Sequence, residues 1–315
     1  MHYFGEIISL LVAFFWTITA LCFEYASKKS GALPLNIIRL GMAFVMLGIT
    51  LWIATGSPIP LSASRETWTW LAISGLIGFV FGDYCLFHAY VQIGSRFTQL
   101  MMTLAPPAAA IGGALILGEE LHSNAVMGMI VTLTGIILSI VGRGEGESSG
   151  RLRLKIPFKG LLLAIGAGIG QGIGLVFSKL GMDYFTLDLN QPDAAHIANW
   201  MVPFAASQIR IITGIVGFFL ILLFTKQLHL LKPALKQGKA MGMASIGTLF
   251  GPFLGVSFSL MAVQYTQTGI ASTLMALTPI IIIWPSYLLF KQKISATEII
   301  GSAISILGVS LFFLS

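Results

Sequence analysis

The stretch LMMTLAP at residues 100–106 returns in closely similar form as TLMALTP at residues 273–279. Sliding the second half of the chain by 173 residues aligns the two prolines, Pro106 and Pro279, without a gap. The same shift also aligns three pairs of glycines, placing Gly82 on Gly255, Gly128 on Gly301 and Gly135 on Gly308. An internal repeat of this length predicts two related structural halves.

The repeat extends towards the start of the chain when the shift is reduced. A shift of 171 residues aligns IIRL (37–40) with QIRI (208–211), so that one arginine falls on another. A shift of 154 residues aligns the first apolar runs of the two halves. The difference indicates a longer loop in the second half, near DYFTLDLNQPDAAHIAN (183–199).

The composition places both halves in a lipid bilayer. The chain of 315 residues is 56% hydrophobic and only 10% charged, whereas a soluble domain has about 25% charged residues. The apolar runs are continuous and do not alternate, which favours membrane helices of about 20 residues over a membrane barrel. Ten segments qualify: 5–27, 36–54, 68–92, 95–117, 124–142, 158–181, 198–224, 240–266, 269–290 and 296–314.

The polar stretch GRGEGESSGRLRLK (142–155) divides these helices five and five. We therefore predict a first five-helix repeat at 1–142, a linker at 143–157 and a second five-helix repeat at 158–315. Because each repeat has an odd number of helices, the second must enter the membrane from the opposite side. The predicted fold is an all-α integral membrane protein with ten transmembrane helices, arranged as two inverted repeats around a central cavity.

The loop charges predict an orientation. One set of loops carries 14 Lys and Arg residues, and the other set, which includes both termini, carries 2. Since cytoplasmic loops hold the excess of positive charge, both termini are predicted to be non-cytoplasmic. The positive residues form no stripe interleaved with aromatic residues, so no nucleic-acid partner is expected.

Two motifs resemble a known family. LMMTLAPPAAAIGGALILGEEL (100–121), followed by a helix with spaced glycines, resembles the EamA-type repeat of the drug/metabolite transporter superfamily. FFWTITALCFEYASK (14–28) looks like the first helix of that repeat. The resemblance implies a multi-pass transporter of the bacterial inner (plasma) membrane but not its substrate. Family members usually start on the cytoplasmic side, and the loop charge of this chain predicts the opposite.

The stretch FGDYCLFHAYVQIG (81–94) puts polar groups in the middle of an apolar run. A charged residue at the bilayer centre costs about 2.5–3.5 kcal/mol, so such groups face the bundle interior, a partner or water. Tyr84, His88 and Gln92 share one helical face, with Asp83 and Phe87 beside it. We predict that these five residues line a substrate cavity, with Asp83 and His88 as candidates for proton coupling. A hydrogen bond between helices is the alternative.

Other polar groups within the helices have structural or functional interpretations. Arg39 and Arg210 can bind an anion, but a structural role is favoured, with Arg39 pairing with Glu24 and Arg210 with an aspartate of its own loop (Asp183, Asp188 or Asp193). Trp16, Gln171 and Ser257 are further predicted substrate contacts. Pro106 and Pro279 are predicted to be hinges within their helices, with static curvature as the alternative.

The glycine-rich stretch AIGAGIGQGIG (164–174) contains no nucleotide-binding motif. Its glycines at 166, 170 and 174 are four apart, a spacing that predicts close helix packing. No set of residues has the spacing of a metal site, and no cofactor is expected. Without a nucleotide site the chain cannot by itself form an ATP-driven pump.

These patterns favour a secondary transporter of small polar or amphipathic metabolites, amino acids among them, that works by alternating access, with proton coupling as a further hypothesis. Its expected partners are a small-molecule substrate and the lipid bilayer. A channel or a membrane scaffold is the alternative. FGD (81–83) is similar to the signature of intramembrane aspartyl proteases, but Val80 stands where that signature has glycine, and no enzyme is expected. The oligomeric state is left open, and a monomer is compatible with the sequence.

Overall fold

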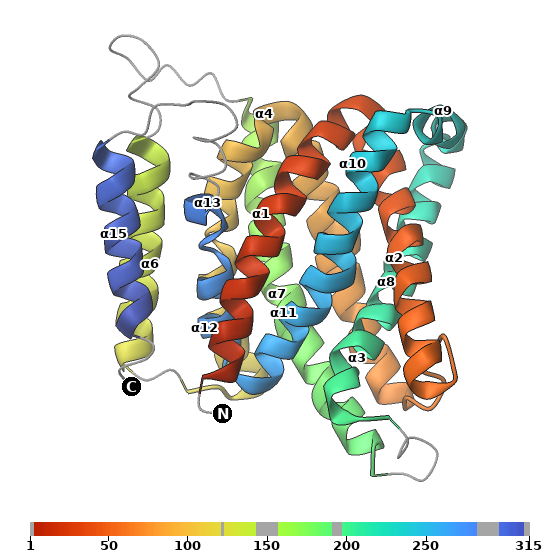
Figure 1. The fold of residues 1–315 in the computed structure, drawn as a ribbon, viewed down its shortest axis with the longest axis horizontal. Coiled ribbons are helices and arrows are strands. Elements are labelled where there is room, and N and C mark those ends of the chain that lie inside the picture. The colour runs from red at the N-terminus through yellow and green to blue at the C-terminus, as the bar shows by residue number, and fades with distance from the viewer. Residues whose placement is uncertain (1–2, 121–122, 143–156, 191–196, 282–295, 312–315) are drawn as a thin grey trace.

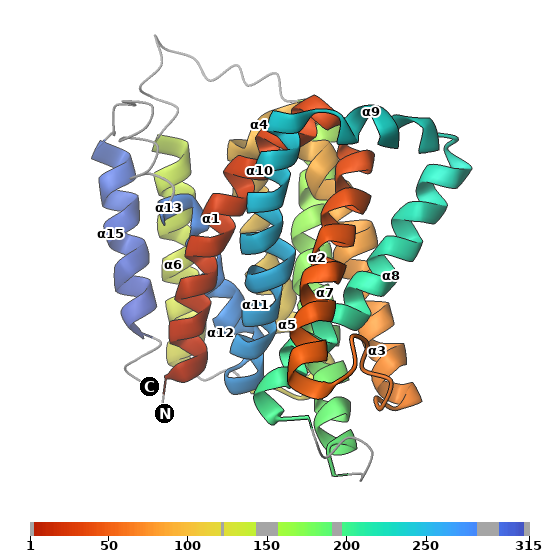
Figure 2. The same cartoon turned by 45° about the vertical axis from the view of Figure 1, so that its right-hand side comes forward.

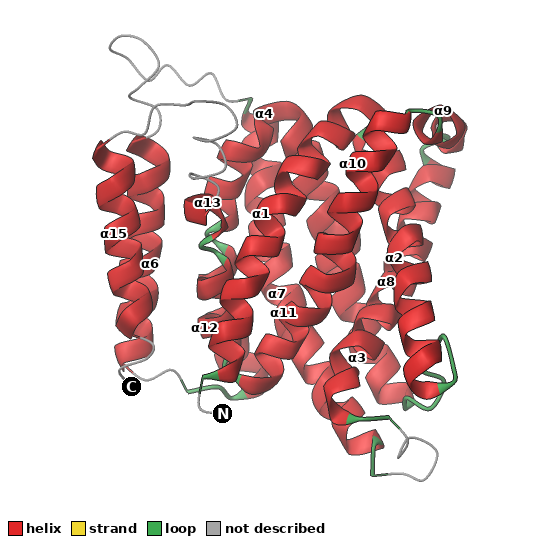
Figure 3. Cartoon of the chain, viewed as in Figure 1, coloured by secondary structure: helices red, strands yellow, loops and turns green. Residues whose placement is uncertain are grey.

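The computed structural model describes residues 3–120, 123–142, 157–190, 197–281 and 296–311, and every element in these ranges is helical (Figure 3). The first half of the chain forms α1 (Phe4–Ser30), α2 (Ala32–Thr55), α3 (Arg65–Gly75), η1 (Leu76–Asp83), α4 (Tyr84–Met102), α5 (Ala105–Gly112), η2 (Gly113–Leu117) and α6 (Ser123–Gly142). The second half forms α7 (Phe158–Asp188), η3 (Asn199–Met201), α8 (Val202–Phe224), η4 (Leu228–Leu230), α9 (Leu231–Leu235), α10 (Gly238–Thr248), η5 (Leu249–Phe253), α11 (Leu254–Tyr265), α12 (Thr268–Met275), α13 (Thr278–Ile281) and α15 (Ala296–Leu311).

The chain is an all-α, multi-pass membrane protein. Six helical segments are long and apolar enough to cross a bilayer, with mean hydropathies from 1.6 to 2.1: Phe4–Ser30, Ala32–Thr55, Arg65–Gly94, Phe158–Asp188, Asn199–Phe224 and Gly238–Tyr265. Shorter apolar helices cover Ala105–Leu117, Ser123–Leu138 and Ile299–Leu311. The predicted segment 269–290 is described only as far as Ile281, and the predicted linker lies almost entirely outside the described residues.

Gly94 separates two predicted membrane segments within α4. It has φ 75° and ψ 167°, a conformation that interrupts the helix and that glycine adopts without a steric penalty. This interruption falls between the predicted segments 68–92 and 95–117. The predicted boundary is therefore confirmed.

Both helices that carry the repeated LMMTLAP-like motif are broken. The first break lies at Thr103–Leu104, and α5 begins directly after it with Pro106 as its second residue. The second break lies at 276–277, and Pro279 is the second residue of α13. Each predicted span is thus interrupted next to its proline, which lies in the first turn of the following helix, where its missing N–H needs no partner. The role of the two prolines as hinges stays a prediction.

Two π-helical stretches begin at equivalent positions of the repeat. Leu76 opens η1 and Leu249 opens η5, and these two residues are 173 positions apart. Such wide turns are rare and are often found at functional sites. The local irregularities of the two halves therefore follow the same alignment as their sequences.

The first helix of each half packs against the other half. In the ribbon, α1 runs beside α10, α11 and α12, whereas α7 packs against α3, η1, α4 and α5 (Figures 1 and 2). Helices α6 and α15 lie side by side in both views. They meet reciprocally: Gly135 faces Ser305 and Gly308 faces Thr132, with the Ser305 hydroxyl donating to the Thr132 carbonyl at 3.2 Å. Equivalent positions thus contact each other in exchanged roles, as expected across a two-fold axis.

The glycine-rich stretch of α7 allows close packing, as predicted. A Cβ atom on Gly174 would lie 2.9 Å from the Cα atom of Gly78, and one on Gly170 would lie 3.1 Å from the Cα atom of Gly82. Both distances are shorter than a normal van der Waals contact. The backbones of α7 and η1 therefore approach one another as closely as they do only because these positions lack side chains.

Candidate functional site

A cavity of about 140 Å³ lies inside the bundle, with room for several water molecules. Both halves contribute to its wall. The broken helices line it at and directly after their interruptions, through Thr103 and Ala105 in the first half and Ala276 and Thr278 in the second. The charged residues of its wall are Arg39, Asp83 and Arg210.

Asp83 is the centre of a buried polar network. The residue is only 4% exposed, and its two carboxylate oxygens have different partners. Oδ2 accepts a hydrogen bond from Nη2 of Arg39 in an ion pair, and Oδ1 accepts one from Nε2 of Gln171 at 2.8 Å. Gln171 also donates to the Gly78 carbonyl at 3.2 Å. The network therefore joins η1, α2 and α7, which belong to different halves of the chain.

Arg39 is fully surrounded. Its Nε donates to Oδ1 of Asn36 at 2.9 Å, and its guanidinium carbon lies 4.7 Å from the ring centroid of Phe87 and 5.5 Å from that of Phe23. Aromatic faces attract a guanidinium and at the same time exclude water from it. The three kinds of partner hold this arginine in one geometry.

The predicted pair between Glu24 and Arg39 is wrong. Arg39 turns into the bundle towards Asp83. Glu24 forms an ion pair with Lys28, one turn further along α1, with 2.5 Å between Nζ of Lys28 and Oε1 of Glu24. The physical reason is the environment. Opposite charges attract more strongly in the buried interior than at the half-exposed end of α1, so the distant aspartate displaces the neighbour in sequence.

Arg210 does not form the ion pair predicted for it with Asp183 or Asp188. Its guanidinium carbon lies 4.7 Å from the ring centroid of Phe79, in the cavity wall, and the residue is 4% exposed. Asp188 is occupied elsewhere, since it accepts hydrogen bonds from the Ser64 amide at 2.8 Å and the Thr67 hydroxyl at 2.7 Å. Asp183 makes no ion pair with Arg210, and Asp193 is outside the described residues.

Four of the predicted substrate contacts line the cavity. Asp83 and Gln171 supply its polar network, and Trp16 and Phe87 supply aromatic wall. Phe87 is 1% exposed, whereas Trp16 is only partly buried and packs against α11. The structure thus brings together residues from α1, η1, α4 and α7. Their part in binding a substrate stays a prediction.

The other four predicted contacts do not line this cavity. The Nδ1 atom of His88 bonds to the Tyr84 carbonyl at 2.7 Å, and the two rings lie 4.2 Å apart, so both side chains are engaged on their own helix. Gln92 lies beside Gly160 at the start of α7, and Ser257 donates to Ser207 at 3.3 Å. Tyr84, His88 and Gln92 were predicted because they form a polar face of one helix. The face of α4 that lines the cavity is instead mainly aromatic.

Sequence reasoning missed Gln99, which lines the cavity and donates from Nε2 to the Tyr90 hydroxyl at 2.9 Å. Tyr90 itself, which is 3% exposed and also lines the cavity, lies with Asp83 and Phe87 on the helical face that the sequence predicts to form a cavity wall. The two arginines at aligned positions of the repeat were a second signal of this wall, because a paired charge inside the membrane is unusual.

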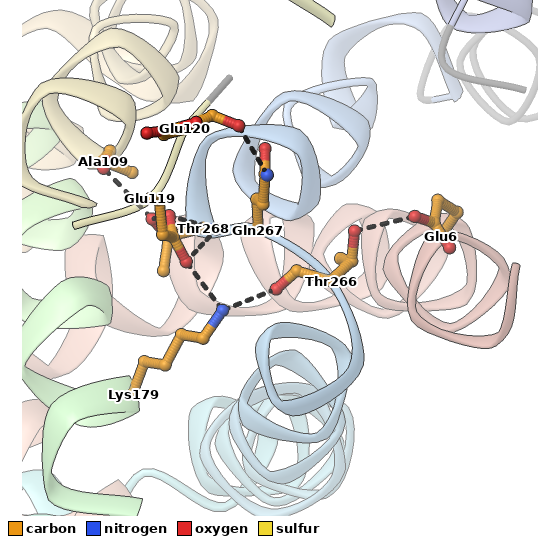
Figure 4. Close-up of polar contacts among 8 residues, drawn as sticks. All are labelled: Glu6, Ala109, Glu119, Glu120, Lys179, Thr266, Gln267 and Thr268. Atoms are coloured by element: carbon orange, nitrogen blue, oxygen red, sulfur yellow. Dashed lines mark hydrogen bonds and ion pairs between the residues drawn. The ribbon is translucent and has the colours of Figure 1, made fainter. Parts of the chain in front are cut away.

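A second polar group joins the helices at the end of the bundle where α1 begins (Figure 4). We call it the end cluster: Glu6, Glu119, Lys179, Thr266, Gln267 and Thr268. Lys179 on α7 donates from Nζ to Oε1 of Glu119 at 2.6 Å and to the Thr266 carbonyl at 2.9 Å. Glu119 follows η2, so this ion pair connects the first half of the chain to the second.

Threonines complete the end cluster. The Thr268 hydroxyl donates to Oε2 of Glu119 at 2.6 Å, and its amide donates to the same carboxylate oxygen at 3.0 Å. The Thr266 hydroxyl donates to Oε1 of Glu6 on α1 at 2.7 Å. The side chains of Lys179 and Glu119 are 18% and 9% exposed. The cluster therefore ties α1, α7, α12 and the segment after η2 together at one end of the cavity.

In the part of the chain that the structure describes, no three His, Cys, Asp or Glu side chains lie close enough to hold a metal ion. Among the charged groups of the cavity wall, Asp83 and Arg39 form an ion pair between helices, whereas Arg210 forms none. A polar cavity between membrane helices is typical of membrane transporters.

The comparison with protein families identifies the class more closely. The model of the EamA-like transporter family matches residues 3–141 and 194–314, so the chain belongs to this family. The resemblance stated from the sequence is confirmed, and since the family is one of transporters, so is the expectation that the chain is not an enzyme.

Similarity to individual proteins is weaker. One crystal structure of a protein superposes with a TM-score of 0.69 at 16% sequence identity, over 100% of this chain and 97% of the other. At this identity the likeness concerns the fold alone. The comparison with curated proteins found no match.

Proposed function

We propose that the protein is a secondary transporter, not driven by ATP, that moves small polar or amphipathic metabolites through the central cavity. The observation that carries this proposal is the buried network of Asp83, Arg39 and Gln171 in a cavity wall built by both halves. Charged groups are expensive inside a membrane and are retained there on substrate or ion pathways.

The transport mechanism that we propose is alternating access of two inverted five-helix repeats, at 1–142 and 158–315, joined by the linker 143–157. The reciprocal contacts of α6 with α15 support the two-fold relation, as do the equivalent starts of η1 and η5. Helices broken close to the cavity are a recurrent feature of transporters built in this way.

In this mechanism the end cluster closes one side of the cavity. Its ion pair between Lys179 and Glu119 must break before the halves can separate at that end. We place the protein in the bacterial inner membrane with both termini on the non-cytoplasmic side. The described conformation is then closed towards the outside.

Asp83 gives the site a means of proton coupling. It is faced by Arg39 on α2, Gln171 on α7 and Arg210 on α8, of which Arg39 forms the ion pair. Protonation of the carboxylate would release Arg39 and change the charge of the cavity by one unit. His88 lies outside the cavity lining and is engaged within α4, so we assign coupling to Asp83 alone.

Counterflow in proteoliposomes tests the proposal. Purified protein is reconstituted, loaded with an unlabelled metabolite panel and offered each labelled member. Ser272→Phe, which fills the cavity, should abolish exchange, and Ser310→Phe, the same change on an exposed face of α15, should not. Exchange no faster than in empty liposomes for every member would refute the proposal.

A further inference from the structure

The charges that face the cavity do not balance. Two arginines, Arg39 and Arg210, and one carboxylate, Asp83, are the ionisable Asp, Glu, Lys and Arg residues of its described lining. With Asp83 ionised, the wall carries one excess positive charge. Inside a bilayer such an excess is costly unless a counter-ion is present in some state of the working protein.

The excess charge can be assigned to one residue. Arg39 has a carboxylate, an amide oxygen and aromatic faces as partners. Arg210 lies against the face of Phe79 and is near enough to Asp83 to interact with its charge, but it forms no ion pair: within the described ranges no carboxylate lies within ion-pair distance of it, and its Nε is buried without a hydrogen bond. The N–H groups of Arg210 therefore remain available to donate hydrogen bonds to a ligand.

The surrounding backbone leaves the guanidinium room. A Cβ atom on Gly78 would lie 3.0 Å from Nη2 of Arg210, so a larger residue at position 78 of η1 would crowd the charged group. The charge is thereby held in the cavity wall, about two turns into α8. The adjoining wall is largely apolar, through side chains such as Trp16, Leu175 and Met275.

We propose that Arg210 binds the carboxylate of a small amphipathic anion, so that the substrate carries net negative charge. This inference rests on the transport function proposed above. The planar fork of a guanidinium matches a carboxylate in a bidentate geometry, and the apolar wall receives the rest of the molecule. An anion of this kind neutralises the cavity while Asp83 remains paired with Arg39.

The test is a thermal-shift titration of the purified full-length protein with acids and amides that are matched in their apolar part, and with one inorganic anion. The probes are 4-methylpentanoate, 4-methylpentanamide and leucine, together with benzoate, benzamide and inorganic phosphate. We expect the carboxylates to raise the melting temperature and the neutral amides to have no effect. Leucine, which carries no net charge, should bind at least tenfold more weakly than 4-methylpentanoate.

Two variants assign the effect to the residue. Arg210→Gln should weaken carboxylate binding at least tenfold, and Arg210→Lys, which keeps the charge but loses the fork, should have an intermediate effect. Arg65→Gln, the same change at an exposed position, should bind as the wild type does. If Arg210→Gln does not fold, the comparison of Arg210→Lys with the wild type decides.

Three outcomes of the thermal-shift titration overturn the inference, and a fourth comes from counterflow. One is equal stabilisation by amides and acids, and another is unchanged carboxylate affinity in both Arg210 variants. The third is stabilisation only by phosphatidylglycerol added to the micelles, which would assign the arginine to a lipid headgroup. Counterflow of neutral or cationic metabolites that is insensitive to Arg210→Lys would also reject the inference while leaving the transport function intact. Absence of any counterflow would instead reject the transport function.

Discussion

Breaking the ion pair between Lys179 and Glu119 should open the cavity at the end of the bundle where α1 begins. The perturbation is Lys179→Met, which removes the ammonium group and keeps much of the side-chain volume. Exposed ion pairs contribute about 0–1 kcal/mol, whereas losing one partner of a buried pair costs about 3–5 kcal/mol. With exposed fractions of 18% and 9%, this pair lies between the two cases. We expect a cost of about 2 kcal/mol, or roughly a 30-fold larger open population.

The assay is alkylation of a reporter cysteine. Ser272→Cys lies one helical turn from Thr268 of the end cluster and lines the cavity. The two native cysteines, Cys22 and Cys85, are both buried and are replaced by serine. A membrane-impermeant maleimide is then added to either side of sealed vesicles in turn. The labelling rate from the end-cluster side should rise roughly 30-fold in Lys179→Met.

A matched control exists at the other end of α1. Lys28 forms an ion pair of the same chemical type with Glu24, but those side chains are 48% and 24% exposed. Lys28→Met should change labelling from the end-cluster side by less than about threefold. Equal rates in the wild type and Lys179→Met would refute the reasoning, as would an equal increase in Lys28→Met.

Three further predictions concern the cavity and its packing. Asp83→Asn should abolish flux driven by a pH gradient while substrate exchange persists, and an unchanged pH dependence in flux assays would remove Asp83 from the coupling mechanism. Gly174→Ala should destabilise the protein by about 1–3 kcal/mol in thermal unfolding, because its Cβ would lie 2.9 Å from a facing Cα atom. Gly242→Ala, where no atom of another group lies within 4 Å, should be neutral or stabilising; equal losses at both glycines would contradict the packing argument. Trp16→Ala should raise the KM for transport at least tenfold and Trp16→Phe much less, whereas an unaltered KM in both would exclude a substrate contact.

The helical segments were predictable because a segment that crosses lipid must be apolar over its length and must also satisfy its backbone hydrogen bonds internally. The predicted boundary at Gly94 and the close packing of Gly170 and Gly174 are both found in the structure. The breaks before Pro106 and Pro279 were not predicted. A proline in an apolar run is compatible with a bend or with a new helix, and only the neighbouring helices decide between them.

The site was predicted in part, for a related reason. Asp83 and Gln171 were selected because their polarity is costly in lipid, and both lie in the cavity wall. His88 was selected by the same argument, yet it satisfies its hydrogen bond within α4. Local polarity therefore identifies groups that must avoid lipid, but it does not distinguish a ligand site from a contact with the same helix.

The repeat explains why one arginine is occupied and the other is available. Arg39 and Arg210 align in the two halves, and both reach the cavity. Asp83, which neutralises Arg39, aligns instead with Val256, so the second half supplies no equivalent carboxylate. The two aligned arginines therefore share a single carboxylate, and one positive charge is left over in the cavity wall. If that charge selects the substrate, then Val256→Asp should provide Arg210 with an internal partner and abolish carboxylate binding. Retention of binding in a folded Val256→Asp protein would show that the missing acid is not what determines the selectivity.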